Sequence, residues 1–234
     1  STFVAKSEDS DNCPIMINIP GKLKMDNCKV TGDRMGVLVR AGDATITNCE
    51  ISMTGTYKDN NNYESSKPWG SGNEVPMAAL VVGSQTQAYK ADANCNITNT
   101  TINAPEDNAK PAIYVSSNSD SQIPGNFKSQ LNISGESSAI KGNVVVADGK
   151  SDKSNPSSVV ISNNATVTGD ITNNSASSFV ALINGATLEG DVTSGANNVF
   201  VENGDNANSN VVALNVKTRH LYSDLATAVS EAQN

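Results

Sequence analysis

The sequence repeats short units at a fixed interval, and this repetition constrains the fold more than any other feature. An Asn-Cys pair that follows alternating apolar and polar residues occurs at 27–28 and again 21 positions later at 48–49. A second unit, Ala-Thr-apolar-x-Gly-Asp, occurs at 165–170 and again 21 positions later at 186–191. A fixed period in the twenties is typical of a solenoid, in which each repeat packs only against its neighbours.

Inside a repeat the pattern has the period of a β-strand. Apolar and polar residues alternate along 44–47 and again along 49–54, and the phase breaks at Asn48. Asparagine tolerates left-handed backbone, so we interpret Asn48 as a bend between two strands. Phe179 and Phe200 are also 21 positions apart, and we expect their rings to stack in the interior.

The chain resembles the right-handed parallel β-helix, or pectin-lyase-like, superfamily. The resemblance rests on an apolar-x-Asn-(Cys/Thr)-x-apolar unit at Asn27, Asn48 and Asn99, and it extends over 21–216. It implies an all-β chain that forms a single-stranded right-handed parallel β-helix of about 21 residues per coil. It also implies a ladder of asparagine side chains stacked at one bend. The resemblance is specific for the fold and leaves the activity open.

The repeats extend through both halves of the chain, which favours one large domain. We expect an N-terminal edge segment over 1–20, a parallel β-helix of about eight or nine coils over 21–216 and an inserted loop over 57–76. In 217–234, apolar residues spaced three and four apart predict a short helix with Ser223 as its N-cap. This helix is either a cap over the end of the solenoid or the start of a truncated further domain.

Four cysteines occur, and their spacing does not suggest a metal site. There is no Cys-x-x-Cys motif, and the chain has one histidine. Cys28 and Cys49 occupy the same repeat position, so we expect them to lie about one strand spacing, ~4.8 Å, apart. Cys13 and Cys95 lie outside this repeat position. Two interpretations stay open, namely buried free thiols and a disulfide among the four.

Charge and hydropathy restrict the partners. The net charge of −8 and the pI near 4.6 argue against nucleic acid, which needs a basic face. No apolar run approaches the ~20 residues that a membrane-spanning helix needs. Only 17% of the residues are charged, and this polarity without charge suits exposed sheet faces and many turns. The chain resembles secreted bacterial β-helix proteins, and this resemblance implies an extracellular, cell-surface location. Because the sequence opens abruptly at Ser1 without a signal peptide, we expect it to be part of a larger chain.

The resemblance also makes an enzyme a candidate function, because β-helix enzymes include polysaccharide lyases and glycoside hydrolases. Their usual marks are Asn-Thr-Asp, Asp-Asp, Gly-His-Gly and Arg-x-Lys, and none of these occurs here. Lyases of this fold use a calcium ion and a basic residue. Arg34 and Arg40 lie near Asp33 and Asp43 in the sequence. We interpret them as a solvated group of ion pairs, with a lyase site as the alternative.

Two acidic residues are the candidate metal ligands. Asp170 and Asp191 both follow glycine and are 21 positions apart, so they are expected to lie on adjacent coils. They either share a calcium ion or are turn residues in solvent. We expect no cofactor other than this calcium ion.

Three aromatic residues of the insertion are the candidate binding residues. Tyr57, Tyr63 and Trp69 lie in the stretch that fits no repeat. Flat aromatic faces stack on sugar rings, which makes a glycan or a host surface molecule the candidate partner. The favoured interpretation of the three rings is that they pack back on the solenoid and fix the loop there.

These observations favour an adhesin-like β-helix with a structural or binding role, and an enzyme is the less favoured class. A polysaccharide lyase or glycoside hydrolase of unrecognised type is the alternative. A third hypothesis is a spacer that binds nothing and separates the domains of a larger surface protein.

Overall fold

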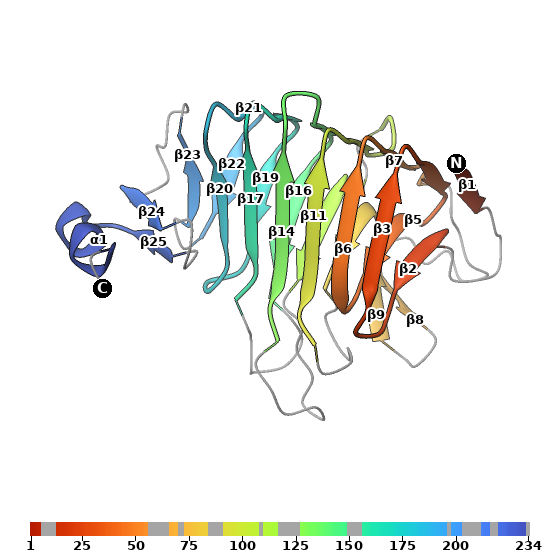
Figure 1. Ribbon diagram of the computed structural model, residues 1–234, viewed down its shortest axis with the longest axis horizontal. Helices are drawn as coiled ribbons and strands as arrows, with labels where there is room; N and C mark the ends of the chain where they lie inside the picture. Colours follow the sequence, from red (N-terminus) through yellow and green to blue (C-terminus); the bar gives the residue numbers. More distant parts are fainter. Residues whose placement is uncertain are drawn as a thin grey trace.

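The alternating segments form short β-strands in the computed structural model of the protein (Figure 1). The structure describes residues 1–5, 13–55, 66–69, 73–83, 91–107, 110–116, 127–148, 156–195, 198–202, 212–215 and 220–232, and for 66–69, 73–76, 220 and 221 it describes the backbone alone. Most of the described strands belong to three parallel sheets of seven strands each, which we call sheets A, B and C.

Each sheet takes one strand from every coil, and the bounds are as follows. Sheet A contains β1 (Thr2–Ala5), β4 (Lys29–Gly32), β7 (Glu50–Met53), β12 (Thr101–Asn103), β15 (Ala139–Lys141), β18 (Thr166–Thr168) and β21 (Thr187–Glu189). Sheet B contains β2 (Ile15–Ile17), β5 (Met35–Val39), β10 (Ala78–Val82), β13 (Ile113–Ser116), β16 (Val144–Ala147), β19 (Ile171–Asn173) and β22 (Val192–Ser194). Sheet C contains β3 (Lys22–Asp26), β6 (Gly42–Thr47), β11 (Ala93–Thr98), β14 (Ser129–Ser134), β17 (Ser158–Ser162), β20 (Phe179–Leu182) and β23 (Val199–Val201).

The chain visits sheets A, B and C in turn, and each strand pairs in parallel with its counterpart in the next coil. This arrangement is consistent with a parallel β-helix. The described residues form seven coils, not eight or nine. The difference arises because some coils are far longer than 21 residues: Asp43 pairs with Asn94, 51 positions on, and Asn96 pairs with Asn132, 36 positions on.

The apolar residues of each strand point into the space between the sheets. Ile46, Ile97, Ile133 and Ile161 stand opposite one another on four successive strands of sheet C, and each is 0–1% exposed. Thr45, between two buried residues of β6, is exposed. Equal residues at equal positions can stack because every coil presents the same face to the interior. This column belongs to one continuous hydrophobic core that extends from Ile17 to Val201.

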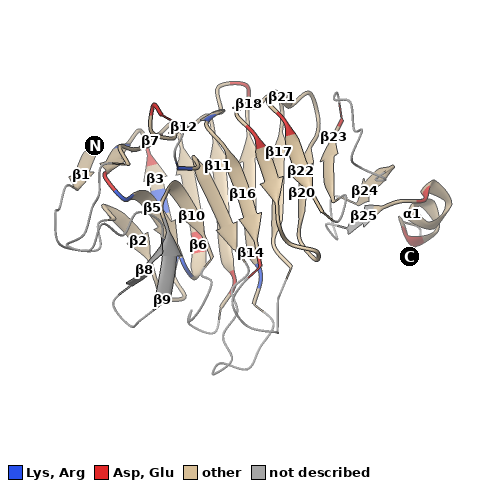
Figure 2. Ribbon diagram, turned by 180° about the vertical axis from the view of Figure 1, so that it is seen from behind, with Lys and Arg blue, Asp and Glu red and all other residues tan. Residues whose placement is uncertain are grey.

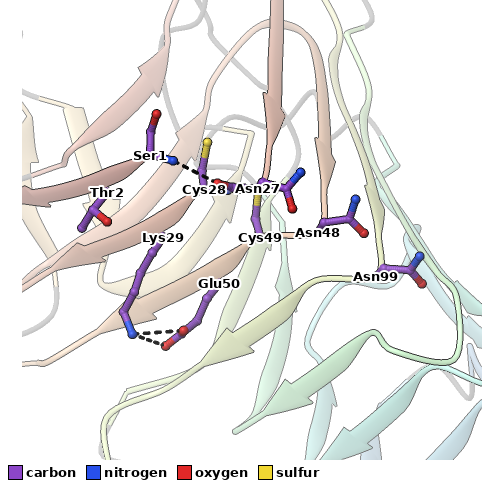
Figure 3. A pocket seen from close by; sticks show the side chains of 9 residues that line it. All are labelled: Ser1, Thr2, Asn27, Cys28, Lys29, Asn48, Cys49, Glu50 and Asn99. Atoms are coloured by element: carbon purple, nitrogen blue, oxygen red, sulfur yellow. Dashed lines mark hydrogen bonds and ion pairs between the residues drawn. The ribbon is translucent and has the colours of Figure 1, made fainter.

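The bend between sheets C and A repeats a left-handed backbone in coil after coil. Asn27, Asn48 and Asn99 have φ of 52°, 52° and 49°, and the strand register aligns them. Figure 3 shows their side chains side by side and pointing the same way. The same bend continues with Gly135, Asn163 and Asn184. Asparagine or glycine stands at each of these bends because other residues are strained at positive φ.

A substitution at Asn163 tests this explanation. Asn163 has φ of 55° and is exposed, so its role is mainly conformational. We expect Asn163→Ala to lower the free energy of unfolding by about 1 kcal/mol, because alanine is strained at positive φ. Asn163→Gly should change it by less than about 0.5 kcal/mol. Urea denaturation of the three proteins measures both values, and equal stability of the alanine and glycine variants would refute the explanation.

The insertion over 57–76 is not wholly a loop. Within it, β8 (Ser66–Trp69) and β9 (Asn73–Pro76) form an antiparallel hairpin in which Trp69 stands opposite Asn73. Tyr57 and Tyr63 lie outside the described residues. The expectation of a patternless loop was therefore incomplete, because these two strands pair with each other and with none of the three sheets.

The expected interior stack of two phenylalanine rings was wrong. Phe200 pairs in register with Ala181, and Phe179 pairs with Ser158. Both rings belong to a second cluster that also contains Val160, Ala181 and Ile183 and is separate from the main core. The reason is that the last interval is shorter than the others, so a spacing of 21 does not place residues opposite each other there.

The C-terminal part differs from the coils. β24 (Ala213–Asn215) and β25 (His220–Tyr222) form an antiparallel hairpin, and α1 (Leu225–Ala232) contacts both strands. In Figure 1 the helix lies at the far end of the molecule, beyond this hairpin. The buried Tyr222 ties the two elements together, because its hydroxyl donates to Glu231 Oε2 at 2.8 Å.

The residue that begins the helix is Asp224 and not Ser223, as the sequence had suggested. Asp224 Oδ2 accepts hydrogen bonds from the Thr227 hydroxyl at 2.6 Å and from the Thr227 backbone N–H at 2.8 Å. These bonds favour the carboxylate and lower the pKa of Asp224. Asp224 is therefore the N-cap of α1, one position later than expected.

Candidate functional site

An open hollow of about 510 Å³ lies on the first coils, where the chain bends from sheet C to sheet A (Figure 3). Its lining comes from β1 and from the three bends that begin at Asn27, Asn48 and Asn99. The lining residues are Ser1, Thr2, Asn27, Cys28, Lys29, Asn48, Cys49, Glu50 and Asn99. The hollow therefore contains the residues of the Asn-Cys repeat unit that dominates the sequence.

Backbone hydrogen bonds fix the geometry of these bends. The N–H of Asn27 donates to Thr47 O at 3.1 Å, and the N–H of Asn48 donates to Thr98 O at 3.0 Å. Ser1 closes one side, because its O accepts from the N–H of Lys29 at 2.8 Å and its amine donates to Asn27 O at 3.0 Å. The bends are thus held by main-chain contacts, and the three asparagine side chains are exposed.

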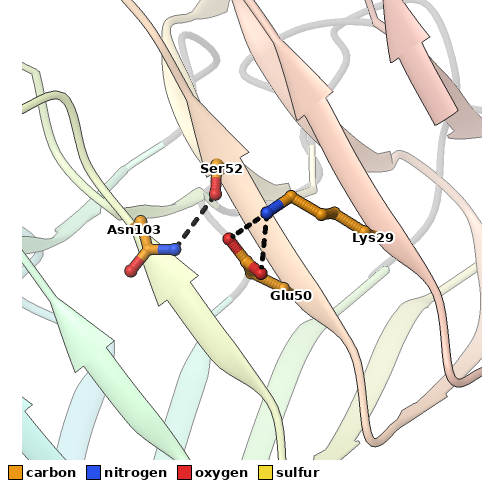
Figure 4. Close-up of polar contacts among 4 residues, drawn as sticks. All are labelled: Lys29, Glu50, Ser52 and Asn103. Carbon is orange, nitrogen blue, oxygen red and sulfur yellow. Dashed lines mark hydrogen bonds and ion pairs between the residues drawn. The ribbon is translucent and has the colours of Figure 1, made fainter. Parts of the chain in front are cut away.

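Polar side chains beside the bends are paired across coils. Lys29 Nζ lies 3.0 Å from both carboxylate oxygens of Glu50, its register partner on the next strand of sheet A (Figure 4). Asn103 Nδ2 donates to Ser52 Oγ at 3.0 Å on the same sheet. The two members of the ion pair are 55% and 42% exposed, so solvent screens the pair and it stabilises the fold by at most about 1 kcal/mol.

The side-chain hydrogen bond that the structure shows at the asparagine row goes to a carboxylate and not to a second amide. Asn48 Nδ2 donates to Asp26 Oδ1 on the preceding strand at 3.1 Å. An amide-to-amide bond of the expected kind occurs at another position, where Asn132 Nδ2 donates to Asn96 Oδ1 at 2.7 Å. The exposed amides at the bends therefore offer both donors and acceptors to a ligand from outside.

All four cysteines are free thiols. Cys49 is buried and Cys28 half-buried, and the Cys28 N–H donates to Cys49 Sγ at 3.4 Å. Burial raises the pKa of Cys13 and of Cys95 to about 12. Of the two interpretations that the sequence left open, the structure has the free thiols.

Asp170 and Asp191 do lie on adjacent coils, and both are exposed. Asp170 Oδ1 accepts the backbone N–H of Asp191 at 2.9 Å, and Asn143 Oδ1 accepts the N–H of Asp170 at 2.9 Å one coil earlier. The side chain on each coil thus binds the main chain of the next. Among the described residues, no group of three or more His, Cys, Asp and Glu side chains could hold a metal ion.

The hydrogen bond from Asp191 gives a prediction for Asp170. Asn143 makes the same bond with an amide oxygen, so Asp170→Asn should change the free energy of unfolding by less than about 0.5 kcal/mol. Asp170→Ala removes the acceptor and should cost about 1 kcal/mol. Thermal denaturation with and without added calcium measures both effects. A large, calcium-dependent loss in Asp170→Asn would instead indicate that the carboxylate charge holds a metal ion.

The interpretation of the arginines as a solvated group was wrong. Arg34 is 1% exposed and Arg40 is 4% exposed. Asp33, which lies between β4 and β5, is 8% exposed. They flank β5, all of whose residues are buried. Asp43, which the sequence placed with them, is exposed and accepts from Asn94 Nδ2 at 2.9 Å. The two guanidinium groups are therefore part of the interior and not of an open surface.

A buried group of hydroxyls lies where sheet B passes to sheet C. Ser175 donates to Asp148 and, at 2.8 Å, to Ser178 Oγ, and Ser178 Oγ accepts the N–H of Ser157 at 2.8 Å. All three serines are 1% exposed. Their burial separates them from solvent, so they serve the turn and are not placed to act on a substrate.

The structure does not describe the side chains of the three aromatic candidates. Tyr57 and Tyr63 are outside the described residues, and for Trp69 the structure gives the backbone of β8 alone. Charged residues are scattered over the described sheets and do not gather into one patch (Figure 2). None of the described helices combines the length and apolarity that crossing a bilayer requires.

Sequence reasoning missed Lys29, Glu50 and Ser1 as parts of the site. A signal for the first two was present, since Lys29 and Glu50 each follow an Asn-Cys pair and are separated by one repeat. The comparisons with known proteins add no residue to the site: no protein-family model, curated protein or solved structure matches the chain.

Proposed function

We propose that this chain is the scaffold of an extracellular bacterial surface protein, adhesin-like in role, that binds glycans. In this proposal the coils form a right-handed parallel β-helix of the pectin-lyase-like kind, and the hollow beside Asn27, Asn48 and Asn99 receives the ligand. The parallel sheets and the repeated coils support the scaffold role. The low charge and polar composition of the chain support the proposed surface location.

The observation that carries the proposal is the row of equal amides. Asn27, Asn48 and Asn99 are exposed, share one bend and line one hollow. Successive coils repeat the group about every 4.8 Å, close to the length of one sugar unit in an extended glycan. Each amide can donate to one hydroxyl and accept from another, so the row suits a linear polymer that repeats its hydroxyls at the same interval.

The charges near the row suit a neutral glycan. Lys29 and Glu50 neutralise each other at 3.0 Å, and Asp26 is bonded to Asn48. Trp69, with Tyr57 and Tyr63, is a second candidate surface for the same class of ligand, because aromatic faces stack on sugar rings.

Binding to a glycan array, followed by calorimetric titration of the strongest ligand, tests the proposal. We expect the double variant Asn48→Ala/Asn99→Ala to bind about thirtyfold more weakly, because two hydrogen-bonding side chains of ~1 kcal/mol each are lost. Asn163→Ala is the matched control, since Asn163 has the same bend and the same positive φ but lies outside the hollow. If Trp69→Ala weakened binding and the asparagine variant did not, the binding site would lie on the insertion.

An activity assay and the glycan array together distinguish the other functions. Release of unsaturated or reducing sugars from polyanionic glycans would favour a lyase or hydrolase, above all if Arg40→Ala abolished it. The burial of Arg34 and Arg40 gives that alternative no support. Absence of binding on the array, with no effect of the hollow variants, would favour a spacer between domains.

A further inference from the structure

Cys28 and Cys49 are direct neighbours on adjacent coils. Asp26 pairs with Thr47 before them, and Lys29 pairs with Glu50 after them. The same offset places Cys28 opposite Cys49. Neighbouring strands lie about 4.8 Å apart, which is inside the ~4.4–6.8 Å range of Cα separations that a disulfide bridges.

The two thiols also have the same local surroundings. The Cys28 thiol donates to Asp26 O at 3.3 Å, and the Cys49 thiol donates to Thr47 O at 3.1 Å. The N–H of Cys28 donates to Cys49 Sγ at 3.4 Å, so the second sulfur already lies against the backbone of the first cysteine. Figure 3 shows both side chains at the hollow, next to each other.

Their position at the hollow separates this pair from the other two cysteines. The half-buried Cys28 and the buried Cys49 both line the hollow. Cys95 is 1% exposed and faces the main core, and the half-buried Cys13 packs against a separate cluster that contains Met35 and Leu38. Burial raises the pKa of both of these thiols to about 12, so neither forms the reactive thiolate readily.

We propose that Cys28 and Cys49 form a disulfide across adjacent coils when the folded protein meets a small disulfide oxidant such as oxidised glutathione. The Cys28 thiolate attacks one sulfur of the oxidant, whose S–S bond breaks and releases one glutathione thiolate. The Cys49 thiolate then attacks the Cys28 sulfur and displaces the second glutathione. Two protein thiols are oxidised, one oxidised glutathione is reduced to two glutathione molecules, and these take up the two protons.

The order of attack follows from the surroundings of the thiols. Burial raises the pKa of the Cys49 thiol; the backbone N–H of Cys28 opposes this rise, and the neighbouring Cys28 thiol adds to it. Cys49 is therefore poor as the first nucleophile, and Cys28, the more open thiol, reacts first. Since both steps need a thiolate, the rate of closure should increase as the pH rises above neutral. This chemistry needs only the two thiols and is independent of what the hollow binds.

Peptide mapping of the native full chain tests the proposal. The folded protein is incubated with oxidised glutathione at neutral and at mildly alkaline pH, alkylated, digested with trypsin without reduction and analysed by mass spectrometry. Trypsin separates Cys28, in peptide 25–29, from Cys49, in peptide 41–58. We expect these two peptides to be joined, with faster joining at the higher pH and full reversal by dithiothreitol.

Variants and controls make the result decisive. The double variant Cys13→Ser/Cys95→Ser should keep the joined peptides, and Cys28→Ser should lose them. The parent protein alone also tests the proposal. Circular dichroism before and after oxidation shows whether the crosslinked protein is folded. Free Cys28 and Cys49 after oxidation, bonds to Cys13 or Cys95 instead, or joining that appears only in urea would each overturn the proposal.

Discussion

Replacing Gly169 with alanine is expected to lower the free energy of unfolding by about 4 kcal/mol, a large fraction of the stability of an ordinary domain. Gly169 has φ of 147°, and a Cβ there would lie 2.5 Å from the carbonyl carbon and 2.6 Å from the oxygen of Gly142. Both obstacles are backbone atoms of the preceding coil and cannot rotate away. The cost therefore combines conformational strain with overpacking, and urea denaturation followed by circular dichroism measures it.

Gly195 supplies the matched control for this prediction. It follows β22 of sheet B in the next coil, at a different bend, and a Cβ built there meets no atom within 4 Å. Gly195→Ala should change the free energy of unfolding by less than about 0.5 kcal/mol. If Gly169→Ala were as stable as Gly195→Ala, the coils could not be as closely stacked at this bend as the structure has them.

The position of Gly169 at a bend could be predicted from the sequence for a physical reason. Gly169 and Gly190 precede the two aspartates of the repeated unit, and their strands pair in register, as Thr168 with Glu189. The left-handed bends at Asn27, Asn48 and Asn99 were visible for the same reason, because a change of phase between two strands needs a residue that tolerates positive φ.

The register predicted from the sequence was wrong where the coil length changed. A period of 21 put Phe179 opposite Phe200, but the strand register is Ala181 with Phe200. Gly135 at the asparagine bend was missed because the coils before and after it differ in length and because glycine replaces asparagine there. Insertions at the bends leave the strands intact, so a sequence can preserve the fold while it loses its regular spacing.

The candidate site was harder to predict from the sequence than the fold, because it depends on the burial and the partners of individual side chains. Arg34 and Arg40 depart from the usual rule that charged side chains are exposed, and the sequence does not show which segments cover their strand. Lys29 and Glu50 form an ion pair only because their strands are neighbours in register. Cys28 and Cys49 are the exception: their shared repeat position predicted their proximity, and their register gives it.

The isoleucine column of sheet C gives the second prediction. Ile133 is fully buried between Ile97 and Ile161, its partners in the preceding and following coils. Ile133→Ala removes three carbon atoms from this column, and the neighbouring backbones are held by strand hydrogen bonds on both sides. We expect the free energy of unfolding to fall by about 3 kcal/mol, the cost of lost burial plus a cavity that the coils cannot close. Urea denaturation measures the loss.

Gln130 on the same strand is the control, because it is outside the main core and only partly buried. Gln130→Ala should change the free energy of unfolding by less than about 0.5 kcal/mol. Hydrogen exchange gives a sharper test, since each coil packs only on its neighbours and the damage should remain local. Protection should fall most in β11, β14 and β17, and a uniform fall over all seven coils would contradict a molecule built by stacking.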